Sequence, residues 1–243
     1  MYKRQIESLP ENFFYERAAL LDIKLPATLK SIGRNAFYQC YGLTQITIPE
    51  GVTSIKDHSF YQCLSLKEIK LPSSLTEIQE YTFQECKSLE SIEFPANITN
   101  ISPGTFYSCL ALQQVKFPAN LNNISNYSFY QCTALEKANL PEGLTKIEYC
   151  AFYQCSGLKE VLFPSTLATL EDQSFYRCSS LTEIALPTSL IYCYRPFYEC
   201  HNIKKVTCLA SVPPTLENNY DILYGVDKSL SLIHISEPTR LRC

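Results

Sequence analysis

Apolar residues recur along this 243-residue chain at a constant interval of 23 residues. Each unit opens with a leucine, and further apolar residues follow three and five positions later, just before a proline. The opening leucines are Leu20, Leu43, Leu66, Leu89, Leu112, Leu135, Leu158 and Leu181. A unit of this length cannot bury its apolar side chains alone, so neighbouring units have to stack. The pattern therefore predicts a solenoid.

The start of each unit alternates between apolar and polar residues, as a β-strand does. In the last full unit, Ile184 and Leu186 face inward, whereas Glu183 and Ala185 face outward. The proline that follows has no N–H and ends the pairing of the strand. Stacked units then place these strands in a parallel sheet with rungs about 4.8 Å apart. We expect this sheet to form the concave side of the solenoid.

Each unit closes with a small residue, a phenylalanine, usually a tyrosine, and a cysteine, as in AFYQC at 36–40. In that unit, Ala36, Phe37, Cys40 and Leu43 are spaced so that one helical face would hold all four. This spacing predicts a short helix or 3₁₀ turn on the back of the solenoid.

Written out, the unit is LxxIxLPxxLxxIxxxAFxxCxxL. This motif resembles the leucine-rich repeat of the BspA-like, or Treponema-type, class, and it matches from about Ile6 to Ile203 over eight full units. The resemblance implies a β-rich (α/β-type) leucine-rich-repeat solenoid that lies on a bacterial or protist cell surface or is secreted. It also implies a role in attachment and protein binding.

The two ends of the chain do not follow the repeat. MYKRQ at 1–5 and LSLIHISEPTR at 230–240 resemble translated transposon adaptors from sequencing-library preparation, in opposite orientations. We therefore treat 1–5 and 230–243 as adaptor-derived and not native, and we exclude them from the prediction of the fold. This is a hypothesis about the origin of the sequence, in which the remainder is a fragment of a longer reading frame.

The remaining sequence divides into two parts. The solenoid covers 6–207, with a partial first unit, eight full units from Leu20, and the start of a further unit at Ile203. Residues 208–229 resemble the beginning of a closing segment, which we expect to be truncated.

Eight cysteines occupy one column of the repeat: Cys40, Cys63, Cys86, Cys109, Cys132, Cys155, Cys178 and Cys200. Buried, reduced cysteine behaves as a small apolar residue, so packing is the favoured interpretation. A disulfide ladder is disfavoured because in-register Cβ vectors run parallel, and zinc because there is no CxxC pair. Outside this column, Cys193 replaces a core isoleucine, whereas we expect Cys150 to be partly exposed and to be the candidate reactive thiol.

Tyrosine follows the phenylalanine in every unit except the one that carries Gln84. We expect these rings to pack rung on rung at the flank of the solenoid; the alternative is that they hold a glycan or a protein segment. Asn97, Asn100, Asn123 and Asn126 each begin an Asn-x-Ser/Thr triplet. These triplets would be glycan acceptors in a secreted eukaryotic chain, but in a bacterium, the case we favour, they arise by chance.

Composition and charge narrow the functional classes. The formal charge is −3 without a basic block, which disfavours nucleic acid as a partner. No apolar run approaches the length of a membrane span. His58 and His201 have no evident acid–base partner, and the chain has no phosphate-binding glycine loop or nucleophile elbow. We therefore expect no catalysis, cofactor or metal.

The outward strand positions remain as the candidate binding surface. They carry mixed charges and become apolar at Leu162 and Ala185. The predicted partner-binding residues are Lys116, Lys137, Asn139, Glu160, Leu162, Glu183 and Ala185. The expected function is adhesion or binding of a macromolecule, a protein or else a glycan, on the concave sheet. An architectural spacer that presents another domain is the alternative, and the repeat flank of an enzyme is the third.

Overall fold

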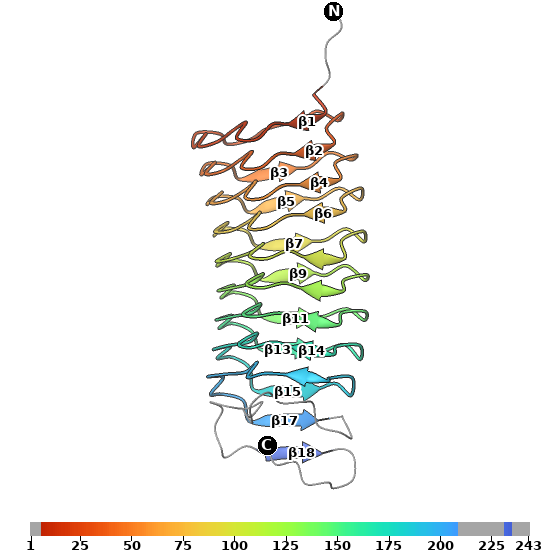
Figure 1. Cartoon of the computed structure of the whole chain (residues 1–243). Coiled ribbons are helices and arrows are strands. Elements are labelled where there is room, and N and C mark those ends of the chain that lie inside the picture. The colour runs from red at the N-terminus through yellow and green to blue at the C-terminus, as the bar shows by residue number, and fades with distance from the viewer. Residues whose placement is uncertain (1–5, 209–230, 235–243) are drawn as a thin grey trace, which may run out of the picture.

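The computed structural model describes residues 6–208 and 231–234, which form a stack of rungs with one 23-residue repeat in each rung (Figure 1). Most rungs contribute two strands that run in opposite directions, joined by a proline turn on one side and a longer turn segment on the other (Figure 1). The predicted parallel β-solenoid with 23-residue repeats is confirmed.

The strand predicted at the start of each unit is present from the unit of Leu43 onward but is absent in the unit of Leu20. We call the surface of these strands the long-strand face. The strands are β3 (Gln45–Thr47), β5 (Glu68–Lys70), β7 (Ser91–Glu93), β9 (Gln114–Lys116), β11 (Lys137–Asn139), β13 (Glu160–Leu162), β15 (Glu183–Leu186) and β17 (Lys205–Cys208). Their pairing is parallel and in register, as between Ile46 and Ile69.

A second column of strands was not predicted. These two-residue strands form the short-strand face: β1 (Ser8–Leu9), β2 (Ser31–Ile32), β4 (Ser54–Ile55), β6 (Glu77–Ile78), β8 (Asn100–Ile101), β10 (Asn123–Ile124), β12 (Lys146–Ile147), β14 (Thr169–Leu170) and β16 (Tyr192–Cys193). The alternation of an outward polar residue and an inward Ile, as in Ser54 and Ile55, was the signal for them.

The expected helix on the back of the solenoid is wrong, because the described residues contain no helix. Two residues in each turn segment, such as Asn35 and Gln39, have positive φ angles near 55° and interrupt any helix. The N–H groups of Phe37 and Gln39 donate to Ser59 and Tyr61 of the next rung, at 2.7 and 2.8 Å. Helical spacing predicted the buried face correctly, but the hydrogen bonds run between rungs.

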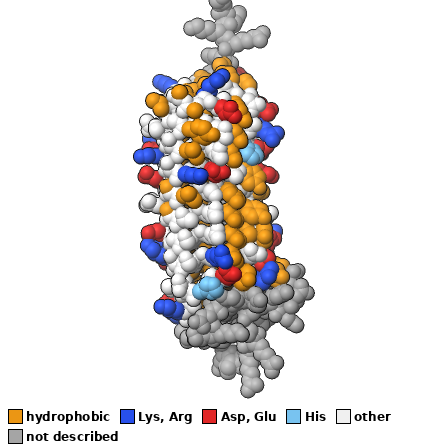
Figure 2. Space-filling view, turned by 90° about the vertical axis from the view of Figure 1, so that its left-hand side faces the viewer, with side chains coloured by type: hydrophobic (Ala, Val, Ile, Leu, Met, Phe, Trp, Pro, Cys, Tyr) orange, Lys and Arg blue, Asp and Glu red, His pale blue; other side chains and the backbone are white. Residues whose placement is uncertain are grey.

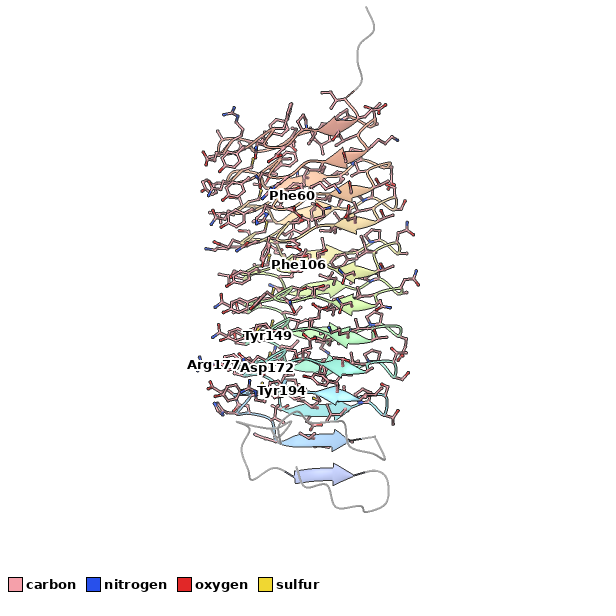
Figure 3. The ribbon with its side chains drawn as sticks, viewed as in Figure 1. Phe60, Phe106, Tyr149, Asp172, Arg177 and Tyr194 are labelled. Carbon is pink, nitrogen blue, oxygen red and sulfur yellow. The ribbon has the colours of Figure 1, made fainter. Side chains whose placement is uncertain are left out.

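The core is a stack of identical columns between the two strand faces and the turns. The phenylalanines that precede the tyrosine column, from Phe37 to Phe197 at one per rung, are fully buried, and Phe60 and Phe106 are labelled in Figure 3. Each of these rings stacks on the next, with ring centroids 5.0 Å apart for Phe37 and Phe60. Replacing one such ring by alanine costs about 3–5 kcal/mol in typical cores. The rungs are therefore held by apolar contact along the stack as well as by strand pairing.

The strands of the long-strand face do not form one continuous ladder. They pair as β3–β5, β7–β9, β11–β13 and β15–β17–β18, whereas the short strands form one four-stranded and one five-stranded sheet. Pairing on the long-strand face therefore lapses between β5 and β7, β9 and β11, and β13 and β15. These lapses shape the surface described below.

β18 (Ser231–His234) pairs with β17 in parallel, with Ser231 opposite Lys205. It falls within the stretch that we interpret as adaptor-derived, and its pairing does not test that origin. The other end stretch, 1–5, and the predicted closing segment from 209 onward lie outside the described residues.

Candidate functional site

The predicted binding residues lie together on the long-strand face, on β9, β11, β13 and β15. All are exposed except Glu160, which is half-buried. Strand alternation orients them outward, while Val161 and Ile184 on the same strands face the core. In the register of β11 with β13, Asn139 lies opposite Leu162, and Lys137 opposite Glu160.

Leu162 is 53% exposed. Among the described residues of the long strands, it is the one large apolar side chain exposed to this degree. A single exposed leucine is common on protein surfaces. Its position within an ordered row of polar side chains is what makes it a candidate anchor.

Charged side chains of this face are paired with one another. Lys137 Nζ lies 2.9 Å from Glu160 Oε2, and Lys116 Nζ contacts Glu93 Oε1 in the neighbouring rung. Toward the C-terminal end, Glu183 contacts Lys205. Exposed pairs like these contribute about 0–1 kcal/mol each to stability. They do, however, leave this part of the face close to neutral, which the sequence alone did not reveal.

A shallow hollow of about 560 Å³ lies on this face between β9 and β11. We call it the β9–β11 hollow, and it is lined by Gln113, Gln114, Val115, Lys116, Phe117, Glu136, Lys137 and Asn139. Three of the seven predicted residues therefore line it, whereas Glu160, Leu162, Glu183 and Ala185 do not. It lies where pairing between neighbouring long strands lapses.

The sequence holds a signal for this hollow that was not recognised. Ala138 occupies an inward position where the other long strands carry isoleucine or valine. Because alanine is smaller, it covers its neighbour less, and Val115 in the adjacent rung is partly exposed whereas Ile69 and Ile92 are buried. Gln113 and Gln114 therefore border an apolar floor rather than a flat sheet.

A second hollow, of about 450 Å³, lies at the N-terminal end of the same face. It is lined by residues that include Asp22, Lys24, Glu68 and Lys70. Residues 22–24 occupy the long-strand position of their rung but do not form a strand. Both hollows thus lie beside an interruption in strand pairing.

The turn segments present the alternative surface. Their tyrosines stack as predicted, with ring centroids 4.6 Å apart for Tyr38 and Tyr61 and 4.4 Å apart for Tyr107 and Tyr130. Figure 2 shows this side as apolar columns beside a polar stripe. Stacking covers the ring faces and leaves mainly edges at the surface, which limits their use as a platform for a sugar ring. At the outer edge of these turns, Arg177 pairs with Glu199 (Figure 3).

The cysteine column is part of the core, as predicted. All eight members are fully buried free thiols. Each Sγ–H also donates to the carbonyl oxygen of the aromatic residue 25 or 26 positions earlier, as Cys109 does to Phe83 at 3.1 Å. Burial raises the pKa of the Cys40 thiol to about 11, so this thiol stays protonated near neutral pH.

Cys150 is not the exposed thiol that the sequence suggested. It is only 2% exposed, and burial raises its pKa to about 11. A thiol that is both buried and protonated is a poor nucleophile. The prediction was wrong because this turn position, open in an isolated repeat, is covered by the neighbouring rungs.

His58 and Asn123 both make contacts within the solenoid. His58 stacks on Tyr81 with ring centroids 5.4 Å apart, and burial lowers its pKa. Across 6–208 and 231–234, no three His, Cys, Asp or Glu side chains are grouped to hold a metal ion. The amide of Asn123 donates to Asn100, Ser125 and Glu148 and is therefore engaged within the solenoid.

Within 6–208 and 231–234, no helix is long and apolar enough to cross a membrane.

Known proteins resemble this chain along most of its length. The family model described as BspA type leucine rich repeat region matches residues 7–136 and 122–219, in six copies. A leucine-rich repeat protein from Bacteroides ovatus is 27% identical, with a TM-score of 0.83, over 96% of this chain and 61% of its own. The T. pallidum leucine rich repeat protein is 30% identical, with a TM-score of 0.61, over 65% of this chain and 74% of its own.

The pneumococcal vaccine antigen PcpA shares the fold, at 20% identity and a TM-score of 0.53, over 95% of this chain and 67% of its own. Comparison with curated proteins found no match. The chain spans about three fifths of the length of the Bacteroides ovatus relative. The family model covers well over half of the sequence, and the 23-residue rungs account for the match. The chain therefore belongs to the BspA-type leucine-rich-repeat family.

Proposed function

We propose that this chain is a non-catalytic adhesion or binding module of a cell-surface or secreted protein, and that it binds a protein partner on the long-strand face. The supporting observation is the row of exposed side chains on β9 to β15, in which β11 and β13 are paired in parallel register and Leu162 is exposed. Side chains on rigid strands lose little conformational entropy when a partner binds. Hot spots form where side chains near the centre of an interface are fully desolvated, and Leu162 can be desolvated without burying a charge.

The proposed contact extends from Lys116 to Glu183. Leu162 and Ala185 supply apolar surface, and Asn139 supplies an amide directly opposite Leu162 in the strand register. Lys116 is paired with Glu93. Replacing Lys116 with an acidic residue would therefore place a second carboxylate beside that of Glu93. We expect this change to slow association and alter its salt dependence more than it changes dissociation.

Relatives of known structure support a location outside the cell. They include bacterial leucine-rich repeat proteins and a pneumococcal vaccine antigen. An antigen is accessible at the cell surface or after secretion, and the same placement is proposed for the protein from which this chain comes.

An architectural spacer is the second candidate. The observation in its favour is that Lys116, Lys137 and Glu183 on the long-strand face all have ion-pair partners within the chain. Such a surface serves equally well to separate other domains. A glycan ligand in place of a protein, and a position beside an enzyme domain, are further alternatives.

Two exposed leucines allow a matched test. The chain is passed over a panel of immobilised secreted and cell-surface proteins, and saturable binding is measured by surface plasmon resonance. Leu162→Asp should weaken binding by about tenfold or more, which is about 1.4 kcal/mol. Leu110→Asp places the same charge on an exposed turn leucine and should have no effect.

A triple change of Tyr38, Tyr61 and Tyr130 to serine tests the surface formed by the turn segments. If this variant loses binding while Leu162→Asp retains it, the turn segments form the binding surface and the proposed site is wrong. If the folded wild-type chain binds no protein on the panel saturably, the spacer is the better function.

A further inference from the structure

Resting on the proposed function, we infer that the β9–β11 hollow is a subsite for an uncharged, extended peptide segment of the protein partner. The inference concerns the kind of group that this hollow accepts. It is carried by strand pairing, charge pairing and the chemistry of the lining side chains.

The main chain is incompletely paired at the hollow. In the paired rungs, the N–H of Phe94 donates to the carbonyl of Lys116 at 3.1 Å, and that of Leu140 to Leu162 at 3.3 Å. Among the described residues, the equivalent bond from Phe117 to Asn139 is not formed. At this point the main-chain groups of β9 and β11 are therefore not hydrogen-bonded to one another, whereas those of β7 and β9 and of β11 and β13 are.

Charges around the hollow are already paired within the chain. Lys116 pairs with Glu93, Lys137 with Glu160, and Glu136 with Lys159 at 2.8 Å. A charged ligand group would have to compete with these partners and be desolvated. The hollow therefore favours an uncharged occupant.

The other lining side chains combine amides with apolar surface. Gln113, Gln114 and Asn139 each both donate and accept hydrogen bonds, as a peptide group does, and the partly exposed Val115 and Phe117 lie beside them. A peptide segment presents this same combination, with main-chain amides next to aliphatic side chains. Its contacts would continue to Leu162, which lies opposite Asn139 on the next rung.

Capped peptides make direct probes. Acetyl-Thr-Val-Asn-Val-Thr-amide is titrated into the isotope-labelled chain at millimolar concentrations. The NMR signals of the Gln114 and Asn139 side-chain amides and of the Val115 methyl groups are followed. An acidic peptide with Asp at each Thr and Asn position, a basic one with Lys at those positions, and chitotriose serve as comparison ligands.

We expect saturable shifts with the neutral peptide and an affinity at least about tenfold weaker, or about 1.4 kcal/mol, for both charged peptides and for chitotriose. Asn139→Asp adds an unpaired charge at the hollow and should weaken neutral-peptide binding by a similar factor. Asn122→Asp, on an exposed residue next to the short strand β10, is the matched control and should bind as the wild type does. Thermal melts establish that both variants fold.

The inference is overturned if the neutral peptide gives no saturable shift, or if a charged peptide or chitotriose binds as tightly. It is also overturned if Asn139→Asp and Asn122→Asp behave alike. Partner binding separates this failure from failure of the proposed function. If Leu162→Asp abolishes binding of a protein partner and Asn139→Asp leaves it intact, the long-strand face is the site and only the subsite is wrong.

Discussion

Truncation of Cys109 measures how closely the cysteine column is packed. The side chain is fully buried, and its Sγ–H donates to the Phe83 carbonyl oxygen. Cys109→Ala removes one heavy atom and leaves a cavity of about its size. The Phe83 carbonyl still accepts the N–H of Cys86 at 3.1 Å, so it is not left without a partner.

The expected cost of Cys109→Ala is about 1 kcal/mol, from lost transfer free energy and a small cavity. The lost thiol hydrogen bond adds little, because its acceptor keeps a main-chain donor. Cys109→Asp places a carboxyl group in the same fully buried space without a cationic partner, and should cost several kcal/mol or prevent folding.

Urea unfolding followed by circular dichroism provides the assay, with midpoint and slope compared among the three proteins. Titration of thiols before and after addition of urea accompanies it, and should find the cysteines reduced but protected until the chain unfolds. Stability unchanged by Cys109→Asp would refute close packing of this column. Four disulfides in the folded, unreduced protein would refute the free-thiol core.

Three further predictions concern the solenoid itself. Burial raises the pKa of the Cys40 and Cys150 thiols to about 11 and also raises the pKa of the Cys132 thiol well above its ordinary value. Above about pH 8.5 the unfolded chain releases protons that these folded thiols retain, so the free energy of unfolding measured in urea should fall between pH 8.5 and 11, by about 1.4 kcal/mol per pH unit for each such thiol. A constant free energy of unfolding over this range would contradict burial of these thiols. A Cβ at Gly104 would clash with the ring of Tyr81, so Gly104→Ala should lower the stability measured in a thermal melt by about 1–3 kcal/mol. A loss just as large in a Tyr81→Ala background would show that the ring is not the cause. Residues 231–234 pair with β17. If this pairing adds little stability, as expected of an adaptor-derived stretch, deleting 1–5 and 230–243 should barely change the melting temperature, whereas a loss of several degrees, about 1 kcal/mol or more, would show that they contribute to the fold.

Much of this architecture follows from the 23-residue interval. Repeated apolar positions can be buried only by stacking, so the solenoid, the inward Ile184 and Leu186, and the buried phenylalanines and cysteines could all be predicted. The outward direction of Leu162 followed from strand alternation alone. Each of these features depends on the chemistry of one unit and on identical neighbours.

The rest depended on contacts between rungs. A spacing that would suit a helix became turns because alternate N–H groups, such as that of Phe37, donate to the next rung. Cys150 is buried by its neighbours, and Lys116 is neutralised by Glu93 one rung away. The β9–β11 hollow arises where Ala138 leaves Val115 less covered and strand pairing lapses. A repeat pattern specifies which face of each unit is apolar, but pairing, burial and charge balance are properties of two stacked units, so only the tertiary structure decided them.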